Sequence, residues 1–193
     1  MILAFPEQPH PVRALRSTVI VSSLNVLRAT GNFERYAANL PADARELLVH
    51  QVAAAWIPLD LAMIHYAACD ALGLTPDQVV ANGRAVFDRT SGSLLGTALR
   101  MAREVGASPW TVLPHLRRFW DRAYDGGAVR VVKTGPKEAR AEAIQARMCE
   151  SVYYRHALRG LLQSVVELFC LKAYVVLLPE RRPAAVTVRV QWA

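Results

Sequence analysis

The sequence predicts an α+β fold in which a helical N-terminal two-thirds packs on a small antiparallel β-sheet formed mainly by the C-terminal third. Apolar residues recur at helical spacing as far as residue 124, and cap and stop signals bound those segments. After residue 127 the pattern changes to Val-rich and alternating segments, which are typical of strands. The chain has 193 residues, 53% of them hydrophobic, which is enough for one core. We therefore expect an N-terminal arm over 1–11 and a single α+β domain over 12–193.

The first elements follow this proline-rich arm. The β-branched residues over 16–22 predict a strand or extended lead-in. Ser23 then provides the cap of a short helix over 24–29, and Gly31 ends that helix.

Two further helices are expected to meet at Pro58. Apolar spacing predicts one helix over 43–56 and another over 59–72. Pro58 lacks an amide donor and its ring clashes with the preceding turn, so it should end the first helix and begin the second. Trp56, just before this step, is expected to be largely buried beneath the sheet.

Cap signals begin the helices that follow. Residues 75–78, Thr-Pro-Asp-Gln, supply a cap, a proline at the first helical position and a capping-box glutamine, so a helix should run to residue 87. Another helix is expected over 93–104. A Ser-Pro pair at 108–109 repeats the start signal for a helix that reaches residue 124.

The strands are expected in the last third, where one segment is ambiguous. Residues 128–133 form a Val-rich strand and 134–136 a turn. Residues 137–148 have helical propensity, but their place after a strand and a tight turn favours the return arm of a hairpin. We favour the strand. A long apolar helix over 153–169 and strands over 173–178 and 186–192 complete the domain.

The charge of the chain does not by itself indicate a polyanion partner. The net charge is +7, and 20 of the 23 basic residues are Arg, spread along the sequence without a block of five or six. A solvated Arg-rich surface explains this composition, and a basic nucleic-acid-associated regulator is the alternative. Three cysteines, Cys69, Cys149 and Cys170, are too few and too scattered for a disulfide framework, so we expect a cytoplasmic protein.

No pattern of catalytic or metal-binding residues stands out. The sequence contains no Gly-x-Ser-x-Gly, Cys-x-x-Cys or His-Glu-x-x-His, and the glycines at 92–96 lack the Gly-Lys-Ser/Thr ending of a phosphate loop. His65 and Cys69 are the one metal-compatible i, i+4 pair, and a structural zinc site takes four ligands. We therefore predict a non-enzymatic protein without a metal.

A ligand pocket is expected between the helices over 59–72 and 153–169 and the sheet. Arg155, one turn into the second helix, is the candidate for holding an anionic head group at its mouth. The alternative is a closed core with Arg155 merely solvated. The side chains expected to line the pocket are His65, Tyr66, Cys69, Leu158 and Leu162.

The linear order of these elements resembles an uncharacterised bacterial family that is expanded in myxobacteria. That family is similar in turn to the superfamily of haem-NO-binding domains, vinyl-reductase-type ligand-binding domains and Bet3-type trafficking subunits. The resemblance spans residues 12–192. It rests on the lead-in over 16–22, the turn at Gly31 and the signature residues Trp56, Pro58, Trp120, Gly126, Gly127 and Gly160.

The resemblance implies helices on one side of an antiparallel sheet with a hydrophobic pocket between them. Its members bind haem, small molecules, acyl chains or protein partners and mostly do no chemistry. The haem-binding branch uses a Tyr-x-Ser-x-Arg signature, which this sequence lacks, since residues 153–155 read Tyr-Tyr-Arg. We therefore predict no cofactor, and a haem-binding gas sensor is the third interpretation.

The function predicted is a non-enzymatic sensor or adaptor domain in bacterial signalling. It would bind a small apolar or anionic-headed ligand, or a protein partner. A homodimer is expected because an Ala- and Leu-rich helical half often leaves an apolar face for a partner helix. An enclosed apolar cavity would favour this interpretation, and a flat contiguous Arg patch would favour the nucleic-acid alternative.

Overall fold

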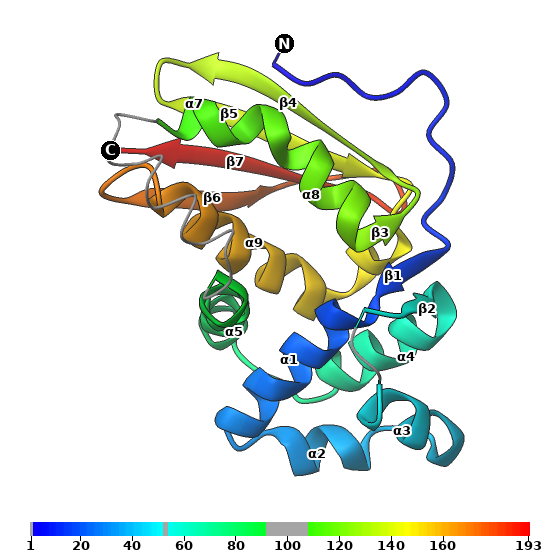
Figure 1. Ribbon diagram of the computed structural model, residues 1–193. Helices are drawn as coiled ribbons and strands as arrows, with labels where there is room; N and C mark the ends of the chain where they lie inside the picture. Colours follow the sequence, from blue (N-terminus) through cyan, green and yellow to red (C-terminus); the bar gives the residue numbers. More distant parts are fainter. Residues whose placement is uncertain (1, 52–53, 92–107) are drawn as a thin grey trace.

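The computed structural model describes residues 2–51, 54–91 and 108–193, and it confirms the predicted α+β fold. Helices fill the first part of the chain, and a four-stranded sheet forms at its end (Figure 1). In chain order the elements are β1 (Ala14–Arg16), α1 (Ser17–Ala29), α2 (Phe33–Ala38), α3 (Ala42–Val49), β2 (Trp56–Pro58), α4 (Leu59–Asp70), α5 (Pro76–Ser91), α7 (Pro109–Val112), the 3-10 turn η1 (Leu113–His115), α8 (Leu116–Ala123), β3 (Tyr124–Asp125), β4 (Ala128–Gly135), β5 (Glu138–Ile144), the 3-10 turn η2 (Arg147–Glu150), α9 (Val152–Glu167), β6 (Ala173–Leu178) and β7 (Val186–Trp192).

The main sheet is antiparallel, with strand order β4-β5-β7-β6. The alternation predicted for β7 is confirmed, since Val186, Val188, Val190 and Trp192 are all buried. The strand favoured over 137–148 is also confirmed as β5. Its Ala and Glu residues prefer helices, but pairing with β4 on one side and β7 on the other overrides that propensity.

Helices cover the apolar face of this sheet. The α9 helix packs along β6, and α8 packs along β4. Trp110 of α7 stacks edge to face on Trp192, with ring centroids 4.6 Å apart. In Figure 1, α8 crosses in front of the sheet and α9 runs below it. The predicted helix over 153–169 and the strands over 173–178 and 186–192 are thus confirmed within a residue or two.

The helices α5 and α9 cross at backbone contact. A Cβ atom on Gly160 would lie 2.1 Å from the carbonyl oxygen of Val80, and one on Gly83 would lie 2.0 Å from that of Ala157. Either distance is far below van der Waals contact, so both positions require glycine. Gly160, a signature residue of the sequence, thus sets the separation of two helices that border the interior.

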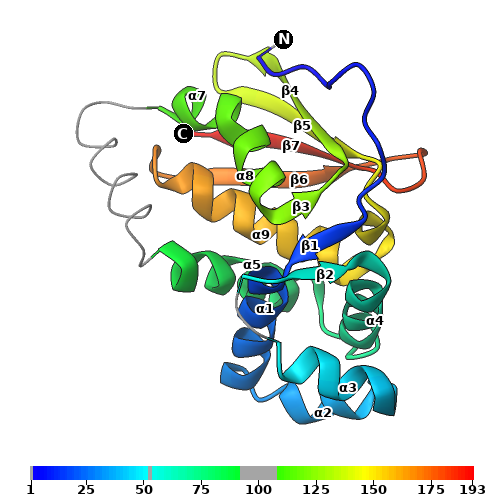
Figure 2. The same cartoon turned by 45° about the vertical axis from the view of Figure 1, so that its right-hand side comes forward.

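A second, three-stranded sheet of order β2-β1-β3 ties the N-terminal arm to the domain. Gly126 has a φ of +99° and lies so close to the arm that a Cβ there would be 2.4 Å from the carbonyl oxygen of Pro11. Leu3 forms an antiparallel bridge with Val131. The arm therefore runs along the β4 edge of the main sheet before it enters β1 (Figure 2).

The lead-in predicted over 16–22 is wrong as a strand. Only Arg16 belongs to β1, and a single helix, α1, begins at Ser17. Ile20, Leu24 and Leu27 are almost fully buried at i, i+4 and i+7, so core packing outweighs the strand preference of the β-branched residues.

The prediction that Trp56 is buried is also wrong. The preceding helix ends at Val49, and Trp56 lies in β2, where alternation points Ile57 inward at 2% exposure and leaves Trp56 43% exposed. The guanidinium of Arg16 lies 4.1 Å from the centroid of the Trp56 ring. Pro58 begins α4 as predicted but does not end a helix.

The capping box at the start of α5 is confirmed. The Thr75 amide donates to Oε1 of Gln78 at 2.9 Å, and the Gln78 amide donates to Oγ1 of Thr75 at 3.3 Å. The helix predicted over 93–104 lies outside the described residues. No helix in the described part of the chain is long and apolar enough to cross a membrane.

Candidate ligand-binding site

His65 lies at the centre of a packed interior and not in an open pocket. Its side chain is fully buried, with Nδ1 2.8 Å from the Tyr36 hydroxyl and Nε2 3.2 Å from the Ser23 hydroxyl. Burial lowers the pKa of His65 to about 3, so the ring is neutral. In the tautomer protonated on Nε2, Tyr36 donates to Nδ1 and the ring donates to Ser23. Both nitrogens are therefore engaged in a structural hydrogen-bond chain.

Aromatic rings fill the space next to His65. The Tyr66 ring packs edge to face on His65, with centroids 5.1 Å apart, and on Tyr154, with centroids 5.2 Å apart. The Tyr154 hydroxyl donates to that of Tyr124 at 3.1 Å. Leu162 is buried and Leu158 is half-buried against the same core. The predicted lining residues His65, Tyr66, Leu158 and Leu162 therefore lie in a closed core, which is the alternative stated in the sequence analysis.

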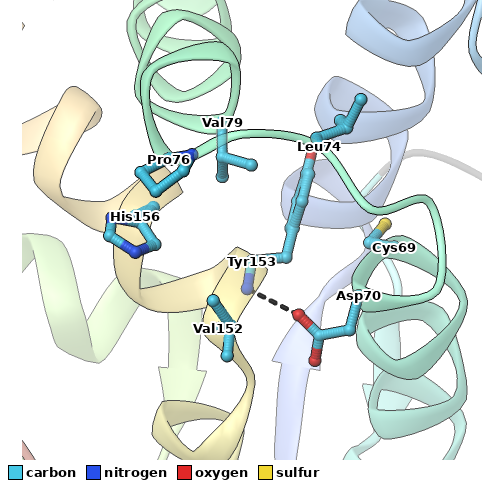
Figure 3. Close-up of a pocket in the computed structure, with 8 residues that line it drawn as sticks. All are labelled: Cys69, Asp70, Leu74, Pro76, Val79, Val152, Tyr153 and His156. Atoms are coloured by element: carbon cyan, nitrogen blue, oxygen red, sulfur yellow. Dashed lines mark hydrogen bonds between the residues drawn. The ribbon is translucent and has the colours of Figure 1, made fainter.

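A hollow lies at the edge of this core, where α4, α5 and the first turn of α9 meet (Figure 3). We call it the helical hollow. Its volume is about 200 Å³. The chain leaves α4 through Gly73, at a φ of +64°, and enters α5 at its capping box, so the turn between them forms one wall. The lining residues are Cys69 and Asp70 of α4, Leu74 of the turn, Pro76 and Val79 of α5, and Val152, Tyr153 and His156 of α9.

Asp70 fixes the start of α9 against the end of α4. Its Oδ1 accepts a hydrogen bond from the Tyr153 amide at 2.6 Å, shown as the dashed line in Figure 3. The Ser151 hydroxyl accepts from the Tyr154 amide at 3.1 Å as the N-cap. A carboxylate at a helix N-terminus is favoured by the helix dipole. Asp70 therefore positions the two helices that carry most of the lining.

His156 differs from His65 in its hydrogen bonding. It is half-buried, and its Nδ1 is a buried atom without a hydrogen-bond partner in the part of the chain that the structure describes. Burial lowers the pKa of His156, and the positive charges of Arg159 and Arg155 lower it further, against an opposing contribution from Asp77. The ring is thus mainly neutral at pH 7 and offers one acceptor nitrogen.

The sequence-predicted residues are divided between these two regions. Cys69 lines the helical hollow, and burial raises the pKa of its thiol, so it stays protonated and unreactive. Arg155 lines neither the helical hollow nor a second hollow of about 320 Å³ between the arm, Trp56 and α8. Its role at a pocket mouth stays a prediction. No group of three His, Cys, Asp or Glu side chains within the described ranges could hold a metal ion.

The sequence did not identify Asp70 and His156 as candidate site residues. Residues 153 and 156 are three apart on a helix and share a face, which is a signal that the sequence does contain. From this turn of the helix the sequence analysis selected Arg155, which does not line the helical hollow. The importance of Asp70 depends on the docking of α4 against α9, which no local pattern reveals.

Arginines gather on the solvent face of the sheet, where they pair with carboxylates. Glu142, nearly buried, lies within 3.0 Å of side-chain nitrogens of Arg130, Arg140 and Arg182. Arg182 also binds Glu180 at 2.7 Å. Burial opposes ionisation of Glu142, but these arginines outweigh it and lower its pKa. The cluster therefore neutralises much of its own charge and gives little support to the nucleic-acid alternative.

Comparison with known proteins gives matches only among solved structures. No protein-family model and no curated protein matches the sequence. The Fe(II) unliganded H-NOX protein from K. algicida matches 93% of this chain and 97% of its own, with a TM-score of 0.66 and 11% identity. An oxygen-binding H-NOX domain related to soluble guanylate cyclases matches 92% of this chain and 95% of its own, with a TM-score of 0.58 and 12% identity.

These matches correct one prediction and confirm another. The prediction that the chain carries no cofactor is contradicted, because the structures that share its fold include haem proteins, one of them solved in a study of how the protein distorts the porphyrin. The predicted similarity to haem-NO-binding domains is confirmed in structure. At 10–12% identity the matches bear on architecture alone. The fold of this chain is that of the haem-NO-binding domains.

Proposed function

We propose that the chain is a non-enzymatic sensor domain that binds a small molecule in the helical hollow. The single observation that carries this proposal is His156, a neutral imidazole that lines the hollow and has a buried nitrogen without a partner among the described residues. A buried polar atom that lacks a hydrogen bond costs about 1–3 kcal/mol, and a binding role is one physical reason to keep it.

The other features of the chain agree with a sensor. The H-NOX structures that match are described as proteins that bind oxygen or carry haem. No disulfide joins Cys69, Cys149 or Cys170 within the described residues, which suits a reducing compartment such as the bacterial cytoplasm. The homodimer expected from the sequence stays part of the proposal, and light scattering that finds a monomer at high concentration would remove it.

Haem-based sensing is the second candidate, and the matched structures favour it. Around the helical hollow, His156 is a chemically suitable iron ligand, and Arg155 and Arg159 follow on the same helix. The space does not suit a porphyrin. The hollow has about 200 Å³, whereas pockets for ligands of drug size span about 300–1,000 Å³. The residues that line the helical hollow therefore do not fit haem, and we derive no step through it.

One experiment separates the two candidates. Freshly purified chain is analysed by native mass spectrometry for a retained small molecule, and is then titrated with haemin while the Soret absorbance is followed. The first candidate predicts a one-to-one complex with a retained molecule of about one ring in size. A stoichiometric Soret band would replace the first candidate with the second.

A pair of valine variants tests the location. Val152 lines the hollow and is 52% exposed, so Val152→Trp should fill the hollow at little cost in stability. Val176, 40% exposed on β6, is the matched control. We expect Val152→Trp to lose the ligand and Val176→Trp to retain it. Equal binding by both variants would show that the hollow is not the site.

A further inference from the structure

The lining of the helical hollow selects ligands by charge. Leu74, Val79 and Val152 give it an apolar wall, and Asp70 and His156 are the titratable polar groups on it besides the Cys69 thiol and the Tyr153 hydroxyl. Among the described residues that line it, none is Lys or Arg. An entering ligand therefore meets a carboxylate and a neutral imidazole, both of which accept hydrogen bonds.

The volume of the hollow limits the size of the ligand. A buried apolar cavity of about 150 Å³ accommodates benzene. At about 200 Å³ the hollow has room for one six-membered ring with a one-carbon substituent. Long acyl chains and fused ring systems exceed this space.

The carboxylate of Asp70 has capacity beyond its structural bond. Oδ1 accepts the Tyr153 amide, which engages one of about four lone-pair sites on an ionised carboxylate. Asp70 lines the hollow and is exposed, so its carboxylate is accessible from solvent at that edge of the hollow. A ligand with an ammonium or hydroxyl group can donate that group's hydrogen bond to Asp70 while its apolar part packs on the apolar wall.

The charges around the rim come from three helices. Asp70 of α4 lines the hollow, Asp77 of α5 raises the pKa of His156, and Arg155 and Arg159 of α9 lower it. Burial contributes most to the lowered pKa of His156, and the two arginines, which do not line the hollow, add to it. Of these four charged groups only Asp70 lines the hollow, so its negative charge favours a cationic ligand.

We propose that the helical hollow is a site for a small primary amine with an apolar body of about one ring, whose ammonium group binds the Asp70 carboxylate while the ring lies among the other lining residues, His156 included. This inference rests on the proposed function, since it names the ligand class of the same site. The sequence suggested a ligand whose anionic head group binds Arg155, whereas this proposal assigns a ligand whose cationic group binds Asp70.

Three compounds of equal size test the ligand class. Benzylamine, benzyl alcohol and benzoate are titrated into the full chain, and binding is followed by thermal shift and by amide chemical-shift changes in NMR. We expect affinity to fall in the order benzylamine, benzyl alcohol, benzoate, with a step of about three- to tenfold between the amine and the alcohol, typical of a charge-assisted hydrogen bond near solvent.

Asp70→Asn gives the matched residue test. The asparagine oxygen still accepts the Tyr153 amide, so the helices should keep their positions. We expect the variant to bind benzylamine no better than benzyl alcohol. Asp60→Asn is the control, because Asp60 is a carboxylate on the same helix that forms an exposed ion pair with Arg147. It should retain the wild-type preference.

The outcomes separate this inference from the proposed function. If benzoate binds as well as benzylamine, or if Asp70→Asn leaves the preference unchanged, the ligand class is wrong, while the loss of binding in Val152→Trp would still support the hollow. If no compound binds and the chain retains no small molecule, the proposed function fails together with the inference.

Discussion

Two histidines 91 positions apart in sequence illustrate two kinds of buried polarity in this molecule. His65 is fully buried with both ring nitrogens hydrogen-bonded, in a core of interlocking tyrosine rings. His156 is half-buried at the rim of that core, with one nitrogen unpartnered in the described chain, beside a hollow. Satisfied polar networks specify a fold, whereas an unsatisfied group at a cavity indicates a site. The sequence pointed to the first histidine as a ligand contact, and the structure directs attention to the second.

The largest effect should follow removal of the core histidine. His65→Ala deletes a fully buried ring and leaves the Tyr36 hydroxyl without its partner, whereas the Ser23 hydroxyl keeps the Tyr153 hydroxyl at 3.3 Å. We expect a loss of about 3–5 kcal/mol in the free energy of unfolding. Urea denaturation measures it. A loss below about 1 kcal/mol would show that the core is not built on this network.

The second effect is a pH dependence from the same residue. The pKa of His65 is about 3 in the folded chain, against about 6.5 when unfolded. Below pH 6.5 the unfolded chain binds a proton that the folded chain does not, so the stability present above pH 6.5 is lost progressively toward pH 3. We expect the free energy of unfolding to fall by about 2 kcal/mol between pH 7 and pH 5.

The pH dependence from His65 has to be separated from the titration of His156 and of the carboxylates. The pKa of His156 is also lowered, so the measurement is made in a His156→Gln background. Carboxylates such as Glu142, whose pKa lies below its ordinary value, add their own loss only at lower pH. Equal stability at pH 7 and pH 5 in this background would contradict a neutral, buried His65.

A smaller loss is expected from a single hydroxyl. Tyr36→Phe keeps the ring but leaves Nδ1 of His65 unpaired in a buried setting. We expect the unfolding free energy to fall by about 1.5 kcal/mol. Tyr174→Phe is the matched control, since Tyr174 is 49% exposed, and it should change stability by less than about 0.5 kcal/mol. If both variants behave alike, the hydrogen bond to His65 contributes nothing measurable.

The smallest effect on stability should come from the rim. His156→Gln removes a half-buried ring whose Nδ1 has no partner within the described residues, so we expect less than about 0.5 kcal/mol in urea denaturation. The same variant should weaken benzylamine binding. A large loss of stability with intact binding would assign His156 to the structural network and not to the site.

Local signals predicted most of the fold. The alternation of β7 and the capping box of α5 each depend on residues close in sequence, and both are confirmed. The start of α1 was mispredicted, because core packing stabilises a helix there despite the strand propensity of its β-branched residues. The exposure of Trp56 was mispredicted, because neighbouring residues of a strand face opposite sides and Trp56 is on the outer one.

The candidate site was predictable only in part. Cys69 was identified because it shares a helical face with His65. Asp70 and His156 acquire their importance from the meeting of α4 with the first turn of α9, a contact between residues more than 80 positions apart. Gly83 and Gly160 let α5 and α9 approach at backbone contact. This close approach favours the closed core over the open pocket, two alternatives that the sequence alone did not separate.

Imidazole NMR of the full chain tests directly whether a ligand binds in the helical hollow beside His156 or in the interior beside His65. The ring ¹H–¹⁵N signals of His65 and His156 are assigned through the two single-residue variants and are followed during titration with benzylamine. We expect the His156 signals to shift in a saturable manner while those of His65 stay unchanged. A saturable shift of His65 with no change at His156 would place the ligand in the interior and not in the helical hollow.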